Sequence, residues 1–155
     1  MKHPLAYRKA TFNDLPKIIE LLAEDELGAT REVVGTTPNL KYIEAFHKID
    51  EDPHHYLMVV EEAGSVIATC HLTLLPSLTM KGSTRLQIEA VRVQASHRSQ
   101  GIGEAMFQKI FEFAKTHEVS ILQLTTNKKR SRAKQFYERL GFKASHEGMK
   151  QVFKK

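Results

Sequence analysis

The chain has 155 residues, of which 41% are hydrophobic and 26% charged, and its formal net charge is +5. This length and composition suit a single globular domain spanning residues 1–155 and argue against a disordered chain. The charge favours an anionic ligand, but no helix–turn–helix or RNA-binding signature accompanies it, so nucleic acid is not expected. No apolar run could span a bilayer and the N-terminus lacks a signal-peptide core, so we expect no membrane partner and a cytoplasmic location.

The N-terminal part of the chain predicts a short strand and two helices. The strand around Tyr7 leads to Thr11 and Asp14, which have the spacing of a helix N-cap, and apolar residues then recur at helical intervals. The acidic run from Glu24 to Glu26 is expected at the end of that helix. A second helix carries apolar residues from Leu40 onward and ends before Pro53.

The middle of the chain predicts an antiparallel meander. "HYLMVVEEAGSVIATCHLTLLP" gives two strands around a turn at Ala63 and Gly64, and the stretch 78–93 supplies a third after a turn near Gly82. The lone cysteine, Cys70, has apolar neighbours and no basic one. We therefore expect a buried, unreactive thiol.

A helix from Gly103, a strand at 121–124, a helix from Ser131 to Gly141 and two final strands, near 142–146 and 149–153, complete the prediction. Runs of strands and helices in this order, with one strand–helix–strand crossover, define an α+β or mixed α/β domain.

Two glycines, Gly101 and Gly103, lie between a predicted strand and the helix that follows it. A helix N-terminus offers unpaired N–H groups and the positive end of the helix dipole, so this joint suits an anion. Met106 breaks the dinucleotide-binding fingerprint, and no Gly-Lys-Ser/Thr completes a nucleoside-triphosphate loop. A phosphate group or a simple tight turn both remain open at this point.

Three segments in order narrow the choice. "RSQGIG" has the form R/Q-x-x-G-x-G/A, and "LQLTTN" and "RAKQFYERLGF" follow downstream. Together they resemble the coenzyme A loop, the next strand and the A-x-x-F-Y-x-x-x-G-F helix of the GNAT superfamily of N-acetyltransferases. The resemblance covers 88–142. It implies acetyl-CoA as cofactor and a mixed, mostly antiparallel sheet of about six to seven strands flanked by about four helices.

The resemblance also implies which residues hold the cofactor. Backbone N–H groups of the glycine loop would bind the pyrophosphate, the preceding strand would pair with the pantetheine arm, and a strand-end asparagine would contact that arm. The residues at these positions are Val91, Val93, Arg98, Ser99, Gln100, Gly101, Ile102, Gly103 and Asn127. Alternatively, Arg98 is solvated and Asn127 is a turn residue.

The same resemblance implies two catalytic residues. Tyr137 would protonate the departing thiolate, since a phenol is still protonated at neutral pH, although its helical spacing alone would place it in the core. Glu89 would deprotonate the amine, and its "IEAVRV" context is similar to that of glucosamine-phosphate and aminoalkylphosphonate acetyltransferases. Apolar neighbours would raise its pKa into a useful range. The alternative for Glu89 is an outward-facing, solvated side chain.

His71 and His146 are candidate substrate contacts, because the family places their segments beside the acceptor pocket. No metal is expected, since the His54–His55 pair lacks ligand spacing. The chain is thus expected to transfer acetyl from acetyl-CoA to a primary amine of a small molecule by direct attack in a ternary complex. An acyl-CoA-binding regulatory or sensor protein, or a protein or peptide N-acetyltransferase, is the alternative. A homodimer remains open.

Overall fold

The computed structural model describes residues 3–154. The chain forms two compact units, Met1–Gln123 and Leu124–Lys155, and each is described by itself.

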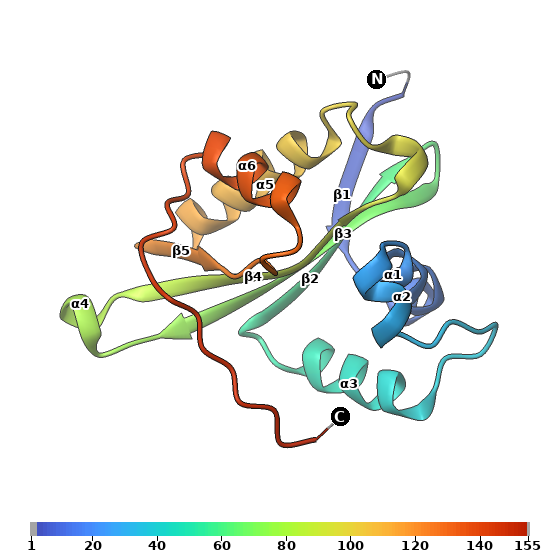
Figure 1. Cartoon of the computed structure of the whole chain (residues 1–155), viewed down its shortest axis with the longest axis horizontal. Coiled ribbons are helices and arrows are strands. Elements are labelled where there is room, and N and C mark those ends of the chain that lie inside the picture. The colour runs from blue at the N-terminus through green and yellow to red at the C-terminus, as the bar shows by residue number, and fades with distance from the viewer. Residues whose placement is uncertain (1–2, 155) are drawn as a thin grey trace. The chain divides into compact units, whose positions relative to one another are not determined.

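The first unit is built on a sheet (Figure 1). Its strands, in spatial order, are β1 (Leu5–Lys9), β2 (His55–Glu62), β3 (Ser65–Pro76), β4 (Thr84–Val93) and β5 (Ile121–Leu124). The first four pair antiparallel, and β2, β3 and β4 form the meander that the sequence predicts. Ser120 N donates to Thr84 O, and Gln123 hydrogen-bonds Gln87. Because these paired positions advance together along both strands, β5 runs parallel to β4.

The helices of this unit number more than expected. They are α1 (Leu15–Ala23), α2 (Glu26–Arg31), α3 (Leu40–Glu51), α4 (Thr79–Gly82) and α5 (Ile102–Thr116), with short 3₁₀ turns at Phe12–Asp14 and Ala95–His97. Together with α6 in the second unit, residues 3–154 hold six α-helices and five strands. The mixed α/β class is confirmed, while the strand count of about six to seven and the helix count of about four were both wrong.

The start of α1 is fixed as the sequence predicts. Thr11 N donates to Asp14 Oδ2 at 2.7 Å, and the Arg8 guanidinium binds both oxygens of Asp14 at 2.7 and 2.9 Å. The hydrogen bonds from Arg8 lower the pKa of Asp14. Arg8 also contacts Glu61 on β2 at 2.8 Å, so one cation ties β1, β2 and the helix start together.

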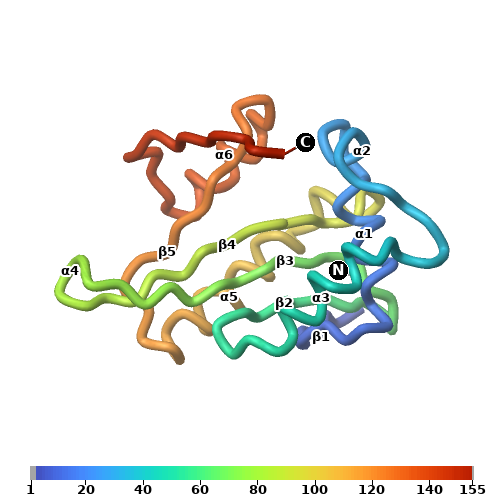
Figure 2. Tube along the Cα trace, turned by 90° about the horizontal axis from the view of Figure 1, so that it is seen from below, coloured from blue at the N-terminus to red at the C-terminus, as the bar shows by residue number. Residues whose placement is uncertain are grey.

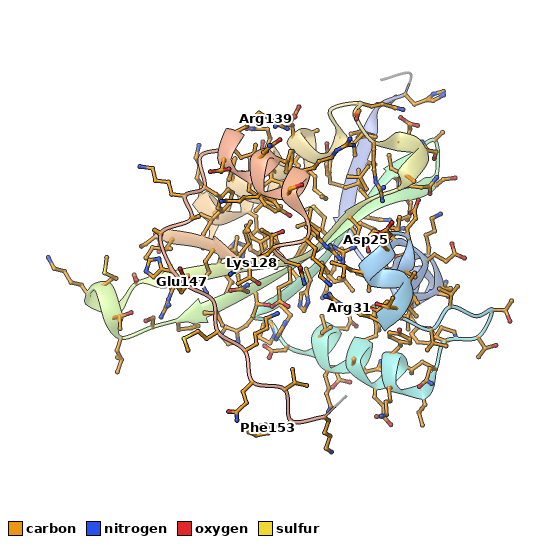
Figure 3. The ribbon with its side chains drawn as sticks, in the orientation of Figure 1. Asp25, Arg31, Lys128, Arg139, Glu147 and Phe153 are labelled. Atoms are coloured by element: carbon orange, nitrogen blue, oxygen red, sulfur yellow. The ribbon has the colours of Figure 1, made fainter. Side chains whose placement is uncertain are left out.

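The acidic run lies at the end of α1, as expected, and Glu24 is the C-cap. That helix stops at Ala23, and Asp25 Oδ1 accepts from Gly28 N at 2.6 Å to cap α2 (Figure 3). Gly28 is buried against the backbone of Leu22, which leaves no room for a side chain. An N-cap and a close-packed glycine therefore start a second, short helix that the sequence did not predict.

Different helices pack against the two faces of the meander: α1 and α3 on one face and α5 on the other. Figure 2 shows α1 and α5 on opposite sides of the sheet. Val59 of β2 joins a buried cluster with Ile18 and Ile19 of α1 and Phe46 of α3. On the opposite face, Tyr56 of β2 meets Phe113 of α5. This α5 face buries the larger set of side chains: Met58, Cys70, Leu72, Leu86, Ile88, Met106, Phe107 and Ile110.

A β-bulge sets the register of β2 and β3. The hairpin turns at Ala63 and Gly64, as predicted, and both have positive φ. Glu61 pairs with Val66, but Val60 pairs with Ala68, so Ile67 is the extra residue. A one-residue shift of this kind moves every later side chain of the strand to the other face.

The second unit, Leu124–Lys155, contains α6 (Ser131–Arg139) and a tail (Figure 3). Gly141 takes φ = 100° and its N–H donates to Glu138 O, while Phe142 N–H donates to Tyr137 O. This is a Schellman motif, in which glycine adopts the left-handed conformation that ends a helix.

The two final strands predicted near 142–146 and 149–153 are absent, because the described part of this tail forms no strand. Met149, Val152 and Phe153 are 92%, 71% and 89% exposed. A strand requires a partner for its backbone groups, and apolar residues alone do not supply one.

Candidate functional site

The second half of β4 extends past the end of β5. Ser120, just before β5, pairs with Thr84, the first residue of β4, and β5 is four residues long against ten for β4. The stretch 89–93 therefore lies beyond the parallel ladder. A strand edge of this kind offers backbone N–H and C=O groups to an extended amide-bearing ligand.

A second bulge lies in this stretch. Thr69 pairs with Arg92 and His71 pairs with Glu89, so Cys70 faces two residues of β4. One of the two, Ala90, has φ = 53°, in the left-handed region that a non-glycine residue rarely adopts. Bulges re-aim backbone groups and bend the strand, so the ladder changes direction beside Glu89 and Val91.

The predicted glycine loop leads directly into α5. Ser99 and Gly101 both have positive φ, at 61° and 79°, and no side chain caps the helix at Gly101. Ala105 N donates to Gly101 O in the first intrahelical bond. The N–H groups of Ile102 and Gly103 therefore have no intrahelical acceptor. These backbone donors at the positive end of a 15-residue helix fit a pyrophosphate.

Arginine side chains contact the carbonyls of the two valines expected to bind the pantetheine arm. Val93 O accepts from Arg98 Nε at 3.1 Å, and Val91 O accepts from Arg92 Nη1 at 2.9 Å. Each carbonyl oxygen can accept a second hydrogen bond. Arg98 thus folds back on β4 in this state, while Gln100 donates to Ser96 O at 3.3 Å.

A band of polar side chains crosses the sheet on the same face as Val59, which we call the polar stripe. The register places its members opposite one another on neighbouring strands: His55 against Thr73 and Leu57 against His71, then Thr73 against Gln87 and His71 against Glu89. Gln123 Nε2 donates to Gln87 Oε1 at 2.8 Å and extends the band onto β5. The polar stripe comprises His55, His71, Thr73, Gln87, Glu89 and Gln123.

Glu89 is exposed on this face, whereas Ile88 points to the α5 face and is buried. The apolar surroundings expected from its sequence neighbours are therefore on the other side of the strand. The outward-facing alternative describes its present orientation. Its cross-strand partner is His71, which the sequence proposed only as a substrate contact.

His71 forms a close pair with a residue that sequence reasoning missed. Its Nε2 lies 2.8 Å from His55 Nδ1, and the two ring centroids are 5.0 Å apart. Burial lowers the pKa of His71, with Glu89 acting in the raising direction and His55 in the lowering direction. His71 is therefore neutral at neutral pH. No local motif marks His55, because it meets His71 only through the register of the hairpin with its bulge.

The remaining predicted residues belong to the second unit. Asn127 Oδ1 accepts from Lys129 N at 2.9 Å, which is the turn role given as its alternative. Tyr137 is half-buried, with its ring edge-to-face with those of Phe136 and Phe142 at 5.4 and 6.0 Å. His146 is exposed and its Nδ1 lies 2.7 Å from Ser145 Oγ.

Within residues 3–154, no group of three or more His, Cys, Asp or Glu side chains is placed to hold a metal ion, and no helix is long and apolar enough to cross a membrane. A hollow of about 480 Å³ lies elsewhere in the first unit, lined by residues that include Lys17, Glu62, Gln94 and His97. None of the residues predicted for the site lines it.

Comparison with known proteins identifies the family. The GNAT acetyltransferase family matches residues 16–142. A crystal structure of a transcriptional regulator from Bacillus halodurans C-125 is 39% identical, with a TM-score of 0.93 over 97% of this chain and 100% of that one. A comparison with curated protein sequences gave no match.

Two more distant structures share the fold. Glucosamine-6-phosphate N-acetyltransferase from Arabidopsis thaliana is 21% identical, with a TM-score of 0.78 over 97% of this chain and 99% of that one. A predicted acetyltransferase with acetyl-CoA from Clostridium acetobutylicum is 18% identical, with a TM-score of 0.75 over 96% of both chains.

The chain belongs to the GNAT acetyltransferase family. Members of this family are acyltransferases that use acetyl-CoA, so the expected enzyme class is confirmed.

Proposed function

We propose that this protein transfers an acetyl group from acetyl-CoA to a primary amine of a small molecule, in a ternary complex and without a covalent enzyme intermediate. The observation that carries the proposal is the position of Glu89. It projects from β4 onto the polar stripe at the point where β4 passes the end of β5, one strand residue before the bulge at Ala90.

Acetyl-CoA, when bound, supplies an acetyl group activated as a thioester. The chain's own part begins with binding: backbone N–H groups from Arg98 to Gly103 would hold the pyrophosphate at the start of α5. Val91 and Val93 would pair with the pantetheine arm through their main chains, and Asn127 would contact that arm. The donors at the helix start and the extended strand edge both suit such a ligand.

Proton movement is the second part. An alkylammonium is almost fully protonated at neutral pH, so its nitrogen becomes a nucleophile only when a base takes a proton. We assign that base to the Glu89 carboxylate. The Tyr137 hydroxyl, which remains protonated at neutral pH, would supply a proton to the departing sulfur.

The proposed acceptor is small and polar. The polar stripe offers hydroxyl, imidazole and carboxamide groups. We propose that His71 of the stripe, and also His146 of the second unit, contact the acceptor. Such groups suit a hydroxylated or phosphorylated amine, whereas an apolar groove would suit a hydrophobic peptide. A protein or peptide acceptor is the alternative that a substrate screen would separate.

The direct test is CoA release from acetyl-CoA with a panel of amines: amino sugars, aminophosphonates, polyamines, aminoglycosides and peptides. We expect at least one small amine to be acetylated and Tyr137→Phe to slow that reaction. Turnover with peptides alone would overturn the small-molecule assignment. Unchanged turnover by Tyr137→Phe would remove Tyr137 from the mechanism.

Cofactor binding is tested separately, by the rise in melting temperature with acetyl-CoA. A ligand that binds only the folded state raises the free energy of unfolding by RT ln(1 + [L]/Kd), and the melting temperature rises with it. We expect Gly101→Ala to weaken this rise, because φ = 79° at Gly101 strains any residue with a side chain. Gly64→Ala, with φ = 81° in the distant β2–β3 turn, is the matched control. An equal response of both variants to acetyl-CoA would contradict the loop assignment.

A regulatory role is the second candidate. The 39%-identical structure is that of a transcriptional regulator, so acyl-CoA binding without turnover is a specific alternative. A melting-temperature rise with acetyl-CoA, together with no acetylation of any amine in the panel, would favour regulation over catalysis.

We further propose that residues 1–155 act as a single domain in the cytoplasm. The exposed Met149, Val152 and Phe153 of the tail support a homodimer, in which a second copy would cover them. A molar mass of one chain, measured by light scattering at micromolar concentration, would overturn the dimer.

A further inference from the structure

We propose that His71 and His55 relay a proton from Glu89 to solvent beside Asp52, so that the amine's proton leaves along the polar stripe. The relay rests on the proposed function, because it serves the base assigned there. All four residues belong to the first unit.

Each of the four residues neighbours the next. Glu89 is the register partner of His71 across the β3–β4 ladder. Directly opposed residues of antiparallel strands project to the same face, with Cβ atoms about 5 Å apart. His71 Nε2 lies 2.8 Å from His55 Nδ1, and His55 Nε2 lies 3.7 Å from Asp52 Oδ2. The path runs from the part of β4 that lies beyond β5, residues 89–93, to the start of β2.

We assign the tautomer of His55 from its neighbours. The Asp52 carboxylate favours the tautomer with the proton on His55 Nε2, which makes Nδ1 the acceptor. His71 Nε2 is then the donor in the 2.8 Å hydrogen bond. His71 Nδ1 is left without a proton and is ready to accept one. Thr73 Oγ1, 3.3 Å from His55 Nδ1, borders the same nitrogen.

The charges around His71 and His55 favour passing a proton on over holding it. Burial keeps His71 neutral, while Glu89 on β4 favours its charged form and His55 on β2 opposes it. At the far end, His54 donates to Asp52 through its backbone N at 2.9 Å and contacts it through Nδ1 at 3.1 Å. These contacts lower the pKa of Asp52, so its carboxylate stays charged and can stabilise a His55 cation.

The proton balance is simple. An N–H bond of the substrate ammonium breaks and Glu89 gains the proton, which passes to His71 Nδ1 directly or through one water. The Nε2–H bond of His71 breaks as its proton bonds to His55 Nδ1. His55, now a cation beside Asp52, loses its Nε2 proton to water, and both rings regain their starting tautomers by exchange. One proton has moved from amine to solvent.

The β2–β3 bulge is what makes this path possible. The register of Glu62 with Ser65, continued without the extra residue, would place Tyr56 opposite His71. His71 would then point toward α5, on the other face from His55. The two histidines therefore share a face of the sheet only because of the extra residue, Ile67.

The first test needs no acceptor. NMR titration of histidine Cε1–H resonances follows His55 and His71 individually in the free protein. We expect coupled titration: Glu89→Gln lowers the pKa of His71 further, and His55→Asn raises it. His47→Asn, at an exposed α3 histidine that stacks on Phe12, is the control and should change neither. If the pKa of His71 were the same in the wild type, Glu89→Gln and His55→Asn, the relay would be overturned.

The second test uses the amine identified by the screen. His71→Asn and His55→Asn should each lower kcat about 10- to 100-fold with the KM for acetyl-CoA unchanged, and added imidazole should restore part of the rate. A merely structural role would not show this rescue. His71→Gln provides a second variant if His71→Asn does not fold.

The outcomes of the two tests are distinguishable. Full activity in both histidine variants would overturn the relay and leave the proposed function intact. Coupled titration in a protein that acetylates no amine would instead overturn the proposed function.

Discussion

Cys70 and His71 are neighbours in β3, yet they belong to different chemical environments. Cys70 lies on the α5 face, fully buried, and burial raises the pKa of its thiol to about 12. His71 lies on the polar stripe, partly exposed and hydrogen-bonded to His55. One face of the sheet is thus packed against a helix, and part of the other carries unburied polar groups.

The comparison teaches that alternation along a strand separates two tasks. The α5 face supplies buried apolar area, which stabilises the fold by about 25 cal/mol per Å². The polar stripe contributes little such area, and its groups would be costly if they were buried without partners. Changes on the two faces should therefore affect different measurements.

The largest expected effect is that of a substitution in the polar stripe. Glu89→Gln should lower kcat by about 10²- to 10⁴-fold, because a carboxamide cannot accept the amine's proton. The melting temperature should stay near that of the wild type, since Glu89 is exposed. Steady-state kinetics with the screened amine measure the first and thermal unfolding the second. Glu44→Gln, at an exposed α3 glutamate, is the matched control.

A substitution on the α5 face should cause a large loss of stability without loss of kcat. Leu72 is fully buried one residue from His71, so Leu72→Ala removes core contacts and leaves a cavity. Such substitutions cost about 2–5 kcal/mol of unfolding free energy. Urea denaturation provides the measurement, and a loss below about 1 kcal/mol would mean that this face is not closely packed.

A smaller, pH-dependent effect separates the faces again. The folded-state pKa of His71 is depressed by burial, so its contribution to stability is present above the unfolded pKa of about 6.5. That contribution is lost as pH falls through the lower, folded-state pKa. His71→Gln should therefore make stability less dependent on pH below about 6.5. An unchanged dependence of the melting temperature on pH would argue against a buried neutral imidazole.

The smallest expected effect is none at all. Cys70 should not react with iodoacetamide in the folded protein at pH 8, because the thiolate is the reactive form and burial disfavours it. Mass spectrometry should find one added carbamidomethyl group only after unfolding in urea. Modification of the native protein would show that the α5 face opens on the timescale of the reaction.

Local chemistry made much of the fold predictable. Thr11 and Asp14 marked the first helix, Ala63 and Gly64 marked the hairpin, and Gly101 and Gly103 marked the joint between β4 and α5 to within one residue. Each of these signals acts through nearby residues, by capping or by a positive φ. The glycine loop and Glu89 belong to the same group, because short motifs carried them.

Features that depend on distant partners were missed. The His55–His71 hydrogen bond joins residues on two strands, and a bulge that the sequence does not mark decides whether they share a face. The tail was assigned strands from its apolar residues, although pairing partners decide whether strands form. The short helix α2 was not predicted, because the tight packing of Gly28 is visible only in three dimensions.

The extra residue in the first hairpin has a consequence for how the chain tolerates insertions and deletions. Ile67 is buried, and its carbonyl accepts the Gln94 N–H at 2.8 Å, so the insertion is anchored at both its side chain and its backbone. Deleting that single residue would leave the strands paired but turn His71 toward the hydrophobic core and Cys70 toward solvent. The number of residues between the turn and His71 thus decides which face His71 occupies, whatever those residues are. Insertions or deletions of one residue there should not be tolerated, whereas substitutions can be.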